Sequence, residues 1–362
     1  MAEIKISGLK KVYPSNAVGF ENVDLLIGGG EFTVILGDSA SGKSALVRTI
    51  CGLDSVTEGE ISIDGTIVND LQPKDRDIAI VVKSVGLYPN LNIFDNLSYG
   101  LKLRKMPKEE IEDRTYEVAR ILGLTDVLSR KPKNVTAIER QRTCIGRALA
   151  RRPKIVILDD PFSDFNEETK SLLCSDILKL QKRSKINFIY CTRSPAEALA
   201  LADKIVYMER GKVLSYATPE DLYDAPKTLS IARAVGEPPI NLFAGKIEKA
   251  NGVVFKGEGF EAAVTNYSEE ELRDHLGTGK AVQLAVRAED MKLGGAIEGT
   301  LEDEREIDDG KLLAFTVSGD RSAHYSLVES DYAFEKGKKE SFSFDESRIN
   351  LFDLETEINI RK

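Results

Sequence analysis

The chain of 362 residues lacks several features that mark membrane-spanning, metal-binding or secreted proteins. It has no run of about 18 apolar residues, the length that a membrane-spanning helix needs. The N-terminal stretch MAEIKISGLKKVYP lacks the apolar core and the small-residue cleavage site of a signal peptide. Cysteine is sparse, and no Cys-x-x-Cys pair indicates a metal or redox site among Cys51, Cys144, Cys174 and Cys191. We therefore expect a protein of the cytoplasm whose cysteines are reduced and buried.

An excess of positive charge is also missing. The chain has 50 Lys and Arg residues against 59 Asp and Glu residues, a net charge of -9. This balance argues against a nucleic acid bound through a broad basic face, so we expect no nucleic-acid partner. Histidine is nearly absent, because the sequence has only His275 and His324. No histidine is therefore available for catalysis in a site built from residues 1–235.

The first 235 residues alternate strand-like and helix-like runs, which is typical of an α/β layer fold. Nearly continuous apolar runs indicate strands that are covered on both faces of a mostly parallel sheet. These runs are FTVILG (32–37), IAIVV (78–82), KIVILD (154–159) and NFIYC (187–191). Between the second and the third we expect a helical insertion over about residues 84–150. Its clearest helix follows Pro107 and places Ile111, Val118 and Leu122 on one face.

The character of the sequence changes at Gly236-Glu237-Pro238-Pro239. Beyond this point short strands alternate with turn signals, including Asn251-Gly252 and Asp309-Gly310, which favour the two-residue turns of hairpins. The sequence therefore predicts two domains. An α/β domain covers residues 1–235, and a small antiparallel, OB-like β domain covers residues 240–362.

The strongest motif follows the first apolar run. Residues 37–44, GDSASGKS, fit Gly-x-x-x-x-Gly-Lys-Ser and precede the apolar helical run ALVRTICGL. In such a P-loop, or Walker A motif, backbone N–H groups and a helix N-terminus point at a polyphosphate. Lys43 would reach the β- and γ-phosphates, and the Ser44 hydroxyl would bind Mg²⁺. The predicted nucleotide-binding residues are Gly37, Asp38, Ser39, Ala40, Ser41, Gly42, Lys43, Ser44 and Ala45.

A carboxylate supports this interpretation. The apolar run KIVILD ends in Asp159, where a Walker B aspartate would lie beside Mg²⁺. Alone, Asp159 would be an ordinary carboxylate at a strand end. Together with the P-loop it predicts a site for a magnesium nucleotide, with Ser44 and Asp159 as the protein ligands of the metal.

The order of these motifs resembles that of the ATPase subunit of ABC importers, and more narrowly that of the maltose-type, sugar-importing group. The likeness covers essentially the whole chain. It rests on GDSASGKS, KDRDIAIVVKSVGLYPNLNIFDNLSYGLKLRK, ERQRTCIGRALARRPKIVILDDP, TRSPAEALALADKIVYMERGKV, AVRAEDM (285–291) and INLF (349–352).

The resemblance implies a P-loop ABC nucleotide-binding domain followed by a TOBE-type regulatory domain, with ATP and Mg²⁺ as ligands. It implies a peripheral protein at the cytoplasmic face of the membrane, bound to two transmembrane permease subunits and a second ATPase subunit. An extracellular solute-binding protein is an indirect partner, and sugars or oligosaccharides are the implied solutes. Tyr13 would stack on adenine, although a half-buried structural tyrosine explains this residue equally well.

The family's pattern is not kept at the positions that act on the γ-phosphate. Lys83 stands where the family has a glutamine, Asp160 where it has the glutamate that positions the attacking water, and Arg193 where it has a switch histidine. The signature loop Leu-Ser-Gly-Gly-Gln is replaced by Val135-Thr136-Ala137-Ile138-Glu139.

Each of these changes has a physical consequence. Aspartate is one methylene shorter than glutamate, and a misplacement of about an ångström costs on the order of a hundredfold in rate. Arg193 only donates hydrogen bonds, whereas a neutral histidine also accepts one. Ala137 and Ile138 add side-chain atoms where a glycine backbone would approach the nucleotide of a paired cassette. We therefore expect Mg-ATP binding with weak or absent hydrolysis.

Three functions are consistent with this sequence. The chain is a poorly hydrolysing importer subunit that pairs with a different, competent ATPase. Alternatively, it is an active homodimeric ATPase in which Lys83, Asp160 and Arg193 compensate one another. The third alternative is a non-catalytic regulatory protein that senses a nucleotide or a partner through residues 240–362.

Overall fold

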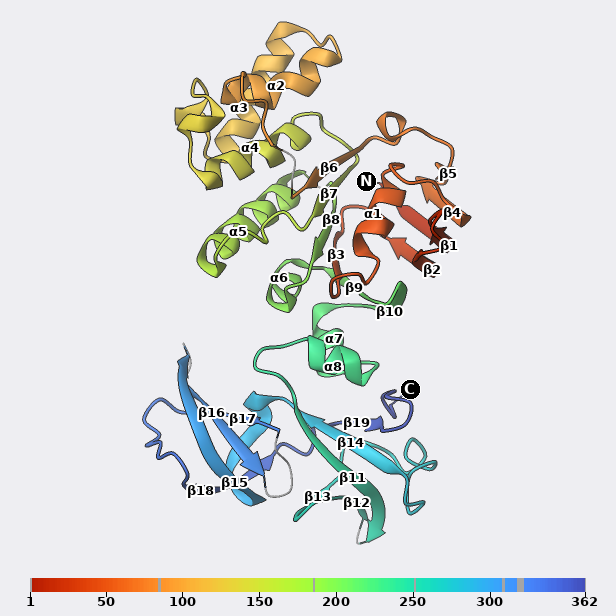
Figure 1. Ribbon diagram of the computed structural model, residues 1–362, viewed down its shortest axis with the longest axis vertical. Helices are drawn as coiled ribbons and strands as arrows, with labels where there is room; N and C mark the ends of the chain where they lie inside the picture. Colours follow the sequence, from red (N-terminus) through yellow and green to blue (C-terminus); the bar gives the residue numbers. More distant parts are fainter. Residues whose placement is uncertain are drawn as a thin grey trace. The chain divides into compact units, whose positions relative to one another are not determined.

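The computed structural model describes residues 2–83, 86–184, 186–250, 252–307, 310–317 and 322–361. The chain divides into two compact units, residues 1–219 and residues 220–362. Figure 1 colours both units along the sequence.

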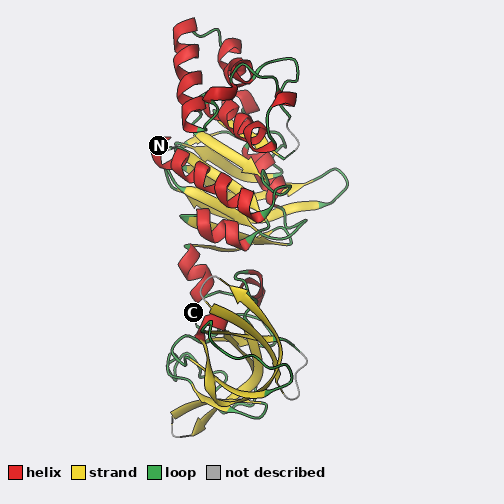
Figure 2. Ribbon diagram, turned by 90° about the vertical axis from the view of Figure 1, so that its left-hand side faces the viewer, coloured by secondary structure: helices red, strands yellow, loops and turns green. Residues whose placement is uncertain are grey.

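A six-stranded sheet forms the centre of the first unit. Its strands are β3 (Phe32–Leu36), β6 (Ile78–Val82), β7 (Ile155–Asp159), β8 (Asn187–Thr192), β9 (Lys204–Glu209) and β10 (Lys212–Ala217). They lie in the order β10-β9-β3-β8-β7-β6, and all neighbours are parallel except β9 and β10. Helices flank these strands (Figure 2), which explains why β3 and β8 are buried along their whole length. The four predicted buried strands are confirmed.

A second, antiparallel sheet lies beside the first in this unit. It consists of β1 (Ile4–Val12), β2 (Val18–Ile27), β4 (Glu58–Ile63) and β5 (Thr66–Ile67), in the order β2-β1-β4-β5. Fully buried residues of both sheets, including Leu9, Phe20 and Ile157, share one hydrophobic core with Leu46. This shared core fixes the first helix after β3 between the two sheets.

The helices of the first unit are α1 (Lys43–Ile50), α2 (Ile93–Leu103), α3 (Lys108–Ile121), α4 (Ala137–Leu149), α5 (Glu167–Ser184) and α6 (Pro195–Leu201). Short 3₁₀ turns occupy Pro73–Asp75, Thr125–Val127 and Pro132–Asn134. The predicted helical insertion between β6 and β7 is present as α2, α3 and α4, which cluster together (Figure 1). Its expected first residue, Ser84, lies outside the described residues.

Close packing holds the insertion together. A Cβ atom on Gly146 of α4 would lie 2.6 Å from a methyl carbon of Leu97, so the glycine lets α4 approach α2. Ile111 and Val118 of α3, and Leu122 directly after it, are buried, as the apolar spacing of this segment predicts. No helix in the described part of the chain is long and apolar enough to cross a membrane.

The second unit consists mainly of antiparallel strands. These are β11 (Asn241–Ala250), β12 (Gly252–Gly257), β13 (Glu261–Ala263), β14 (Ala281–Val286), β15 (Met291–Ile307), β16 (Gly310–Val317), β17 (His324–Val328), β18 (Lys339–Phe344) and β19 (Asn350–Asp353). They form two sheets, in the orders β13-β12-β11-β14-β19 and β17-β16-β15-β18. Phe255, Phe315 and Phe342, from both sheets, are fully buried in one core. This β-rich architecture is consistent with a TOBE-type domain.

The two predicted hairpins are present as pairs of strands. Ala250 of β11 lies opposite Gly252 of β12, and Ile307 of β15 lies opposite Gly310 of β16. Of the predicted turn residues, Asn251 and Asp309 lie outside the described residues.

The division between the units lies at 219–220 rather than at 235–240. The intervening helices, α7 (Pro219–Asp224) and α8 (Leu229–Ala234), belong mainly to the second unit. Leu229 and Ala232 of α8 are buried against Ala285 and Phe352 of the β domain. A buried guanidinium adds to this attachment, because Arg287 donates hydrogen bonds to three main-chain oxygens, those of Tyr223, Ala232 and Val235.

We expect Arg287→Met to loosen α8 from the β domain. The substitution leaves buried carbonyl oxygens without donors, at a cost of about 2 kcal/mol or more in the free energy of unfolding. Hydrogen exchange of residues 228–243, measured by mass spectrometry on the full chain, should become faster. The control is Arg233→Met, which removes an exposed ion pair with Glu357 (3.9 Å) and should change little. Equal exchange in both variants would contradict the assigned role of Arg287.

Candidate functional site

The predicted phosphate-binding loop connects β3 to α1, and two of its glycines are required by close backbone contacts. A Cβ atom on Gly37 would lie 2.1 Å from the carbonyl oxygen of Met208 on β9. At Gly42 it would lie 2.5 Å from the carbonyl oxygen of Gly19 on β2. Gly42 also has a positive φ of 100°, which side-chain-bearing residues rarely adopt. The loop therefore packs directly against the backbones of both sheets of the first unit.

The side chain of Lys43 is surrounded by the backbone of this loop. Its Nζ donates hydrogen bonds to the carbonyl oxygens of Gly37 (2.6 Å) and Asp38 (2.7 Å) and to the hydroxyl of Ser41 (3.1 Å). Burial lowers the pKa of the ammonium group below its ordinary value. The N-terminus of α1 has no side-chain cap, so its first backbone N–H groups are free to bind an anion. The loop thus offers a cation and N–H donors to the same ligand.

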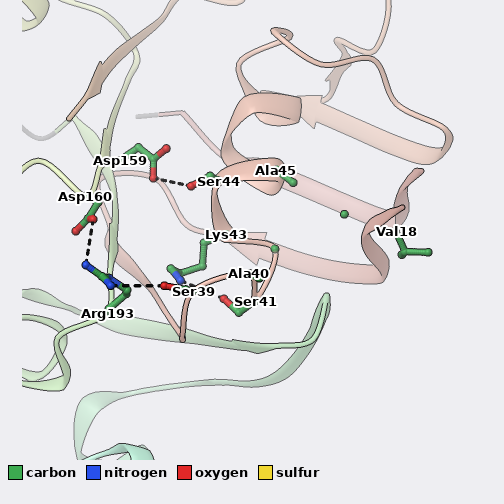
Figure 3. A pocket seen from close by; sticks show the side chains of 12 residues that line it. Val18, Ser39, Ala40, Ser41, Lys43, Ser44, Ala45, Asp159, Asp160 and Arg193 are labelled. Carbon is green, nitrogen blue, oxygen red and sulfur yellow. Dashed lines mark hydrogen bonds and ion pairs between the residues drawn. The ribbon is translucent and has the colours of Figure 1, made fainter. Parts of the chain in front are cut away.

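The two predicted metal ligands lie next to each other. The Ser44 hydroxyl donates to Oδ1 of Asp159 across 3.2 Å, from α1 to the end of β7 (Figure 3). Burial raises the pKa of the Asp159 carboxyl, and the neighbouring Asp160 adds to this effect. A hydroxyl and a carboxylate are hard oxygen ligands that suit Mg²⁺, which usually completes its shell with water and substrate phosphates. The described residues contain no cluster of three His, Cys, Asp or Glu residues that could hold a metal alone.

Asp160 and Arg193 face each other across the loop. A guanidinium nitrogen of Arg193, which follows β8, lies 4.0 Å from a carboxylate oxygen of Asp160. Another donates to the Ser39 hydroxyl at 3.5 Å. Figure 3 shows Arg193 between the two, next to Lys43. The cations Lys43 and Arg193 and the carboxylates Asp159 and Asp160 therefore all line the same cavity.

These residues line one open cavity of about 490 Å³. Its lining consists of Val18, Gly19, Ser39, Ala40, Ser41, Gly42, Lys43, Ser44, Ala45, Asp159, Asp160 and Arg193. Most of the residues predicted from sequence are thus brought together. The sequence did not predict Val18 and Gly19, because no motif marks the start of β2. The contact between Gly19 and Gly42 brings the start of β2 to the cavity.

Other predicted residues lie outside the cavity lining. Lys83 is exposed and forms an ion pair with Asp164 at 2.7 Å. The Tyr13 hydroxyl donates to Asp54 at 3.0 Å, and the Lys11 ammonium lies 5.1 Å from the centre of its ring. Tyr13 is half-buried, and its observed contacts are with these two partners. These contacts support the interpretation of Tyr13 as a structural residue.

The segment at the position of the signature loop forms the start of α4. Thr136 is the N-cap, and its Oγ1 accepts a hydrogen bond from the backbone N–H of Glu139 (3.2 Å). The Glu139 carboxylate in turn accepts from the backbone N–H of Thr136 (2.7 Å). This capping box occupies two N–H groups of the helix N-terminus. The hydrogen bond from Thr136 also lowers the pKa of Glu139, which keeps a negative charge at this end of α4.

Comparison with known proteins agrees with the site. The family model described as ABC transporter matches residues 20–163. The oligosaccharides import ATP-binding protein MsmX of Bacillus subtilis is 33% identical over 100% of both chains. The multiple sugar-binding transport ATP-binding protein MsmK of Streptococcus mutans is also 33% identical over 100% of both chains. The sn-glycerol-3-phosphate import ATP-binding protein UgpC of Bartonella bacilliformis is 40% identical over 70% of this chain and 74% of the relative.

A solved structure extends the likeness to the three-dimensional level. The ATP-binding cassette MJ0796, bound to ADP and Pi in a post-hydrolysis state, has a TM-score of 0.53 and 28% identity. The match covers 60% of this chain and 98% of that one. The P-loop, the free N-terminus of α1 and the Ser44–Asp159 pair suit ATP and Mg²⁺. Relatives that match over the full length show that this chain belongs to the ABC transporter family, as an ATP-binding subunit.

Proposed function

We propose that the chain is the ATP-binding subunit of an importer for sugars or oligosaccharides, that it holds Mg-ATP, and that it hydrolyses ATP slowly. The solute class is supported by the names of the full-length relatives. The subunit works at the cytoplasmic face of the membrane on two permease subunits that receive the solute from an external binding protein. A second, catalytically competent ATPase subunit completes the assembly.

Binding of ATP is assigned to the loop and its neighbours. Lys43 and the N-terminus of α1 hold the phosphates, while Ser44 and Asp159 hold Mg²⁺, which neutralises charge on the phosphate oxygens when bound. Lys43 at present bonds two carbonyl oxygens of its own loop. A phosphate oxygen would replace these neutral acceptors with a charged one and form a stronger hydrogen bond.

One observation carries the proposal of slow hydrolysis. The carboxylate available to orient a water molecule is that of Asp160, and its neighbour is the guanidinium of Arg193 at 4.0 Å. A carboxylate that faces a permanent cation is a weaker hydrogen-bond acceptor for water. Arg193 would also hold the γ-phosphate in the ground state, and ground-state binding by itself does not raise the turnover rate.

The capping box of α4 supports the same conclusion. In this family, two cassettes close on each other's nucleotide through the N-terminal end of this helix. Here Thr136 and Glu139 bind each other's backbone N–H groups, and Glu139 adds a negative charge. Both features weaken the contact that α4 can make with a triphosphate held by a partner cassette.

A second candidate function is that of an active homodimeric ATPase. The Asp160–Arg193 contact favours it, because an arginine can also fix the direction of a short carboxylate. The two candidates differ in the turnover rate of the purified chain. A rate of about 1 per second or faster, at the low end of common enzyme rates, would favour the active homodimer.

We expect Lys43→Ala to weaken Mg-ATP binding on the order of a hundredfold, since it removes charged hydrogen bonds to the phosphates. Equilibrium binding of a fluorescent ATP analogue to the full chain measures this. The control is Lys83→Ala, which changes an exposed lysine outside the cavity and should leave the affinity unaltered. Unchanged affinity in Lys43→Ala would contradict the assignment of the loop.

We expect the pair Asp160→Glu and Arg193→His to raise ATP turnover on the order of a hundredfold, because it restores the reach of the carboxylate and removes the cation beside it. Phosphate release by the purified chain is the measurement. Arg193→His alone serves as a second variant if glutamate is poorly tolerated at the positive φ of 49° at position 160. A drop in turnover in both variants would instead favour the active homodimer.

We expect a different ATPase to co-purify with this chain. The chain would be tagged in its native host, extracted with its membranes in a mild detergent, and its partners identified by mass spectrometry. A second cassette with an intact glycine-rich signature loop, together with permeases, is the expected result. Permeases with this cassette alone would contradict the mixed assembly.

A further inference from the structure

The second unit contains a cavity of its own, of about 230 Å³. One wall is the segment Glu237–Pro238–Pro239, and the other is the outer face of β15, β16 and β17. The cavity belongs entirely to residues 220–362 and shares no residue with the nucleotide site. Binding in this cavity can therefore be tested separately from nucleotide binding.

The pairing of the strands determines which side chains share this outer face. Asp303 lies opposite Ala314, and Ala314 lies opposite Tyr325, so these three form one row across the sheet. Because side chains alternate along a strand, Arg305 shares the face of Asp303. The residue between Leu312 and Ala314, Leu313, has 0% exposure and points into the core. The cavity floor is thus an aromatic ring flanked by a carboxylate and a guanidinium.

A buried amide fixes the two walls relative to each other. Asn241 follows the Pro238–Pro239 wall by two residues and is 1% exposed. Its Nδ2 donates to the carbonyl oxygen of Tyr325 (2.8 Å), and its Oδ1 accepts from the Tyr325 backbone N–H (2.6 Å). The backbone of the Tyr325 floor is therefore held beside the proline wall before any ligand binds, which lowers the entropic cost of binding.

The charged side chains of the lining are largely unused within the protein. Glu304 has a partner, the Lys311 ammonium at 3.3 Å. In contrast, Glu237, Asp303 and Arg305 make no side-chain hydrogen bond or ion pair within the described part of the chain. Two carboxylates and one guanidinium thus remain as hydrogen-bonding groups around an apolar surface.

We propose that this cavity binds a neutral polyol of the size of a single sugar ring. The carboxylates of Glu237 and Asp303 accept hydrogen bonds from hydroxyl groups, and Arg305 donates to hydroxyl or ring oxygens. The Tyr325 ring and the two prolines cover the C–H surface of the sugar. A volume below the range of about 300–1,000 Å³ that drug-sized ligands occupy fits one ring rather than an oligosaccharide.

The charges of the site disfavour an anionic ligand. An anion would meet the two free carboxylates. Two free carboxylates against one guanidinium leave one net negative charge, because Glu304 is paired with Lys311, so a cation is the competing class of ligand. The choice of a neutral ligand rests on the apolar surface of Tyr325 and the two prolines. A ligand with several hydroxyl groups satisfies all three charged groups without adding charge.

Saturation-transfer difference NMR on the full chain tests the proposal, with glucose, galactose, mannose and xylose as separate probes and putrescine as the cationic probe. We expect a signal from at least one sugar at millimolar concentration and none from putrescine. Asp303→Asn keeps the shape of the side chain and should weaken sugar binding tenfold or more, because hydrogen bonds to a charged group are lost. Arg305→Gln is a second variant that should act in the same direction.

The control is Glu306→Gln, which removes a carboxylate from the same strand outside the cavity lining. Sugar binding that is unchanged in this control and lost in the Asp303 and Arg305 variants would support the proposal. The absence of a signal from every sugar, a signal from putrescine alone, or equal losses in all three variants would overturn it. ATP binding measured on the same samples should be unaltered, so failure here is distinct from failure of the nucleotide site.

Discussion

The nucleotide site depends on how closely one loop approaches two sheets. Gly37 contacts the backbone of β9 and Gly42 contacts the backbone of β2, at distances that leave no room for a side chain. Ser41 adds a further link, because its carbonyl oxygen accepts from the N–H of Gly211, in the turn between β9 and β10. The loop is therefore held by the sheets that share the core around Phe20 and Ile157. Phosphate binding and the stability of the first unit rest on the same contacts.

The electrostatics of this site differ between its two ends. Lys43 and the uncapped N-terminus of α1 attract the phosphates, and the Ser44–Asp159 pair offers oxygen atoms to Mg²⁺. At the other end, Asp160 faces a fixed cation, Arg193. In α4 the helix N-terminus is closed by its own side chains, while its packing through Gly146 against α2 is retained. The packing of α4 against α2 and the charged contact between Asp160 and Arg193 thus involve different residues, so one can change without the other.

Much of the fold follows from the sequence pattern. The buried strands β3, β6, β7 and β8 were predicted because runs of apolar residues bounded by turns form parallel strands covered on both faces. The phosphate loop was predicted because its glycines, lysine and serine have a fixed spacing that suits a polyphosphate. The boundary of the second unit was harder to place. Helix α8 is attached to the β domain through Arg287, and the carbonyl groups that Arg287 contacts lie more than 50 residues away in the chain.

The sequence by itself indicated the family, through the order of several motifs along the whole chain. It also predicted the phosphate-binding loop, because that loop depends on local spacing within one strand–loop–helix unit. Ser44 and Asp159 stay predicted metal ligands, and the structure places them side by side although they lie far apart in the sequence. Only the tertiary structure decided the partners of the other charged residues. It placed Arg193 beside Asp160 and Ser39, paired Lys83 with Asp164, and added Val18 and Gly19 to the cavity. It also assembled the cavity around Tyr325 from three strands and a distant proline segment. Such contacts join residues far apart in the chain, and no local pattern encodes them.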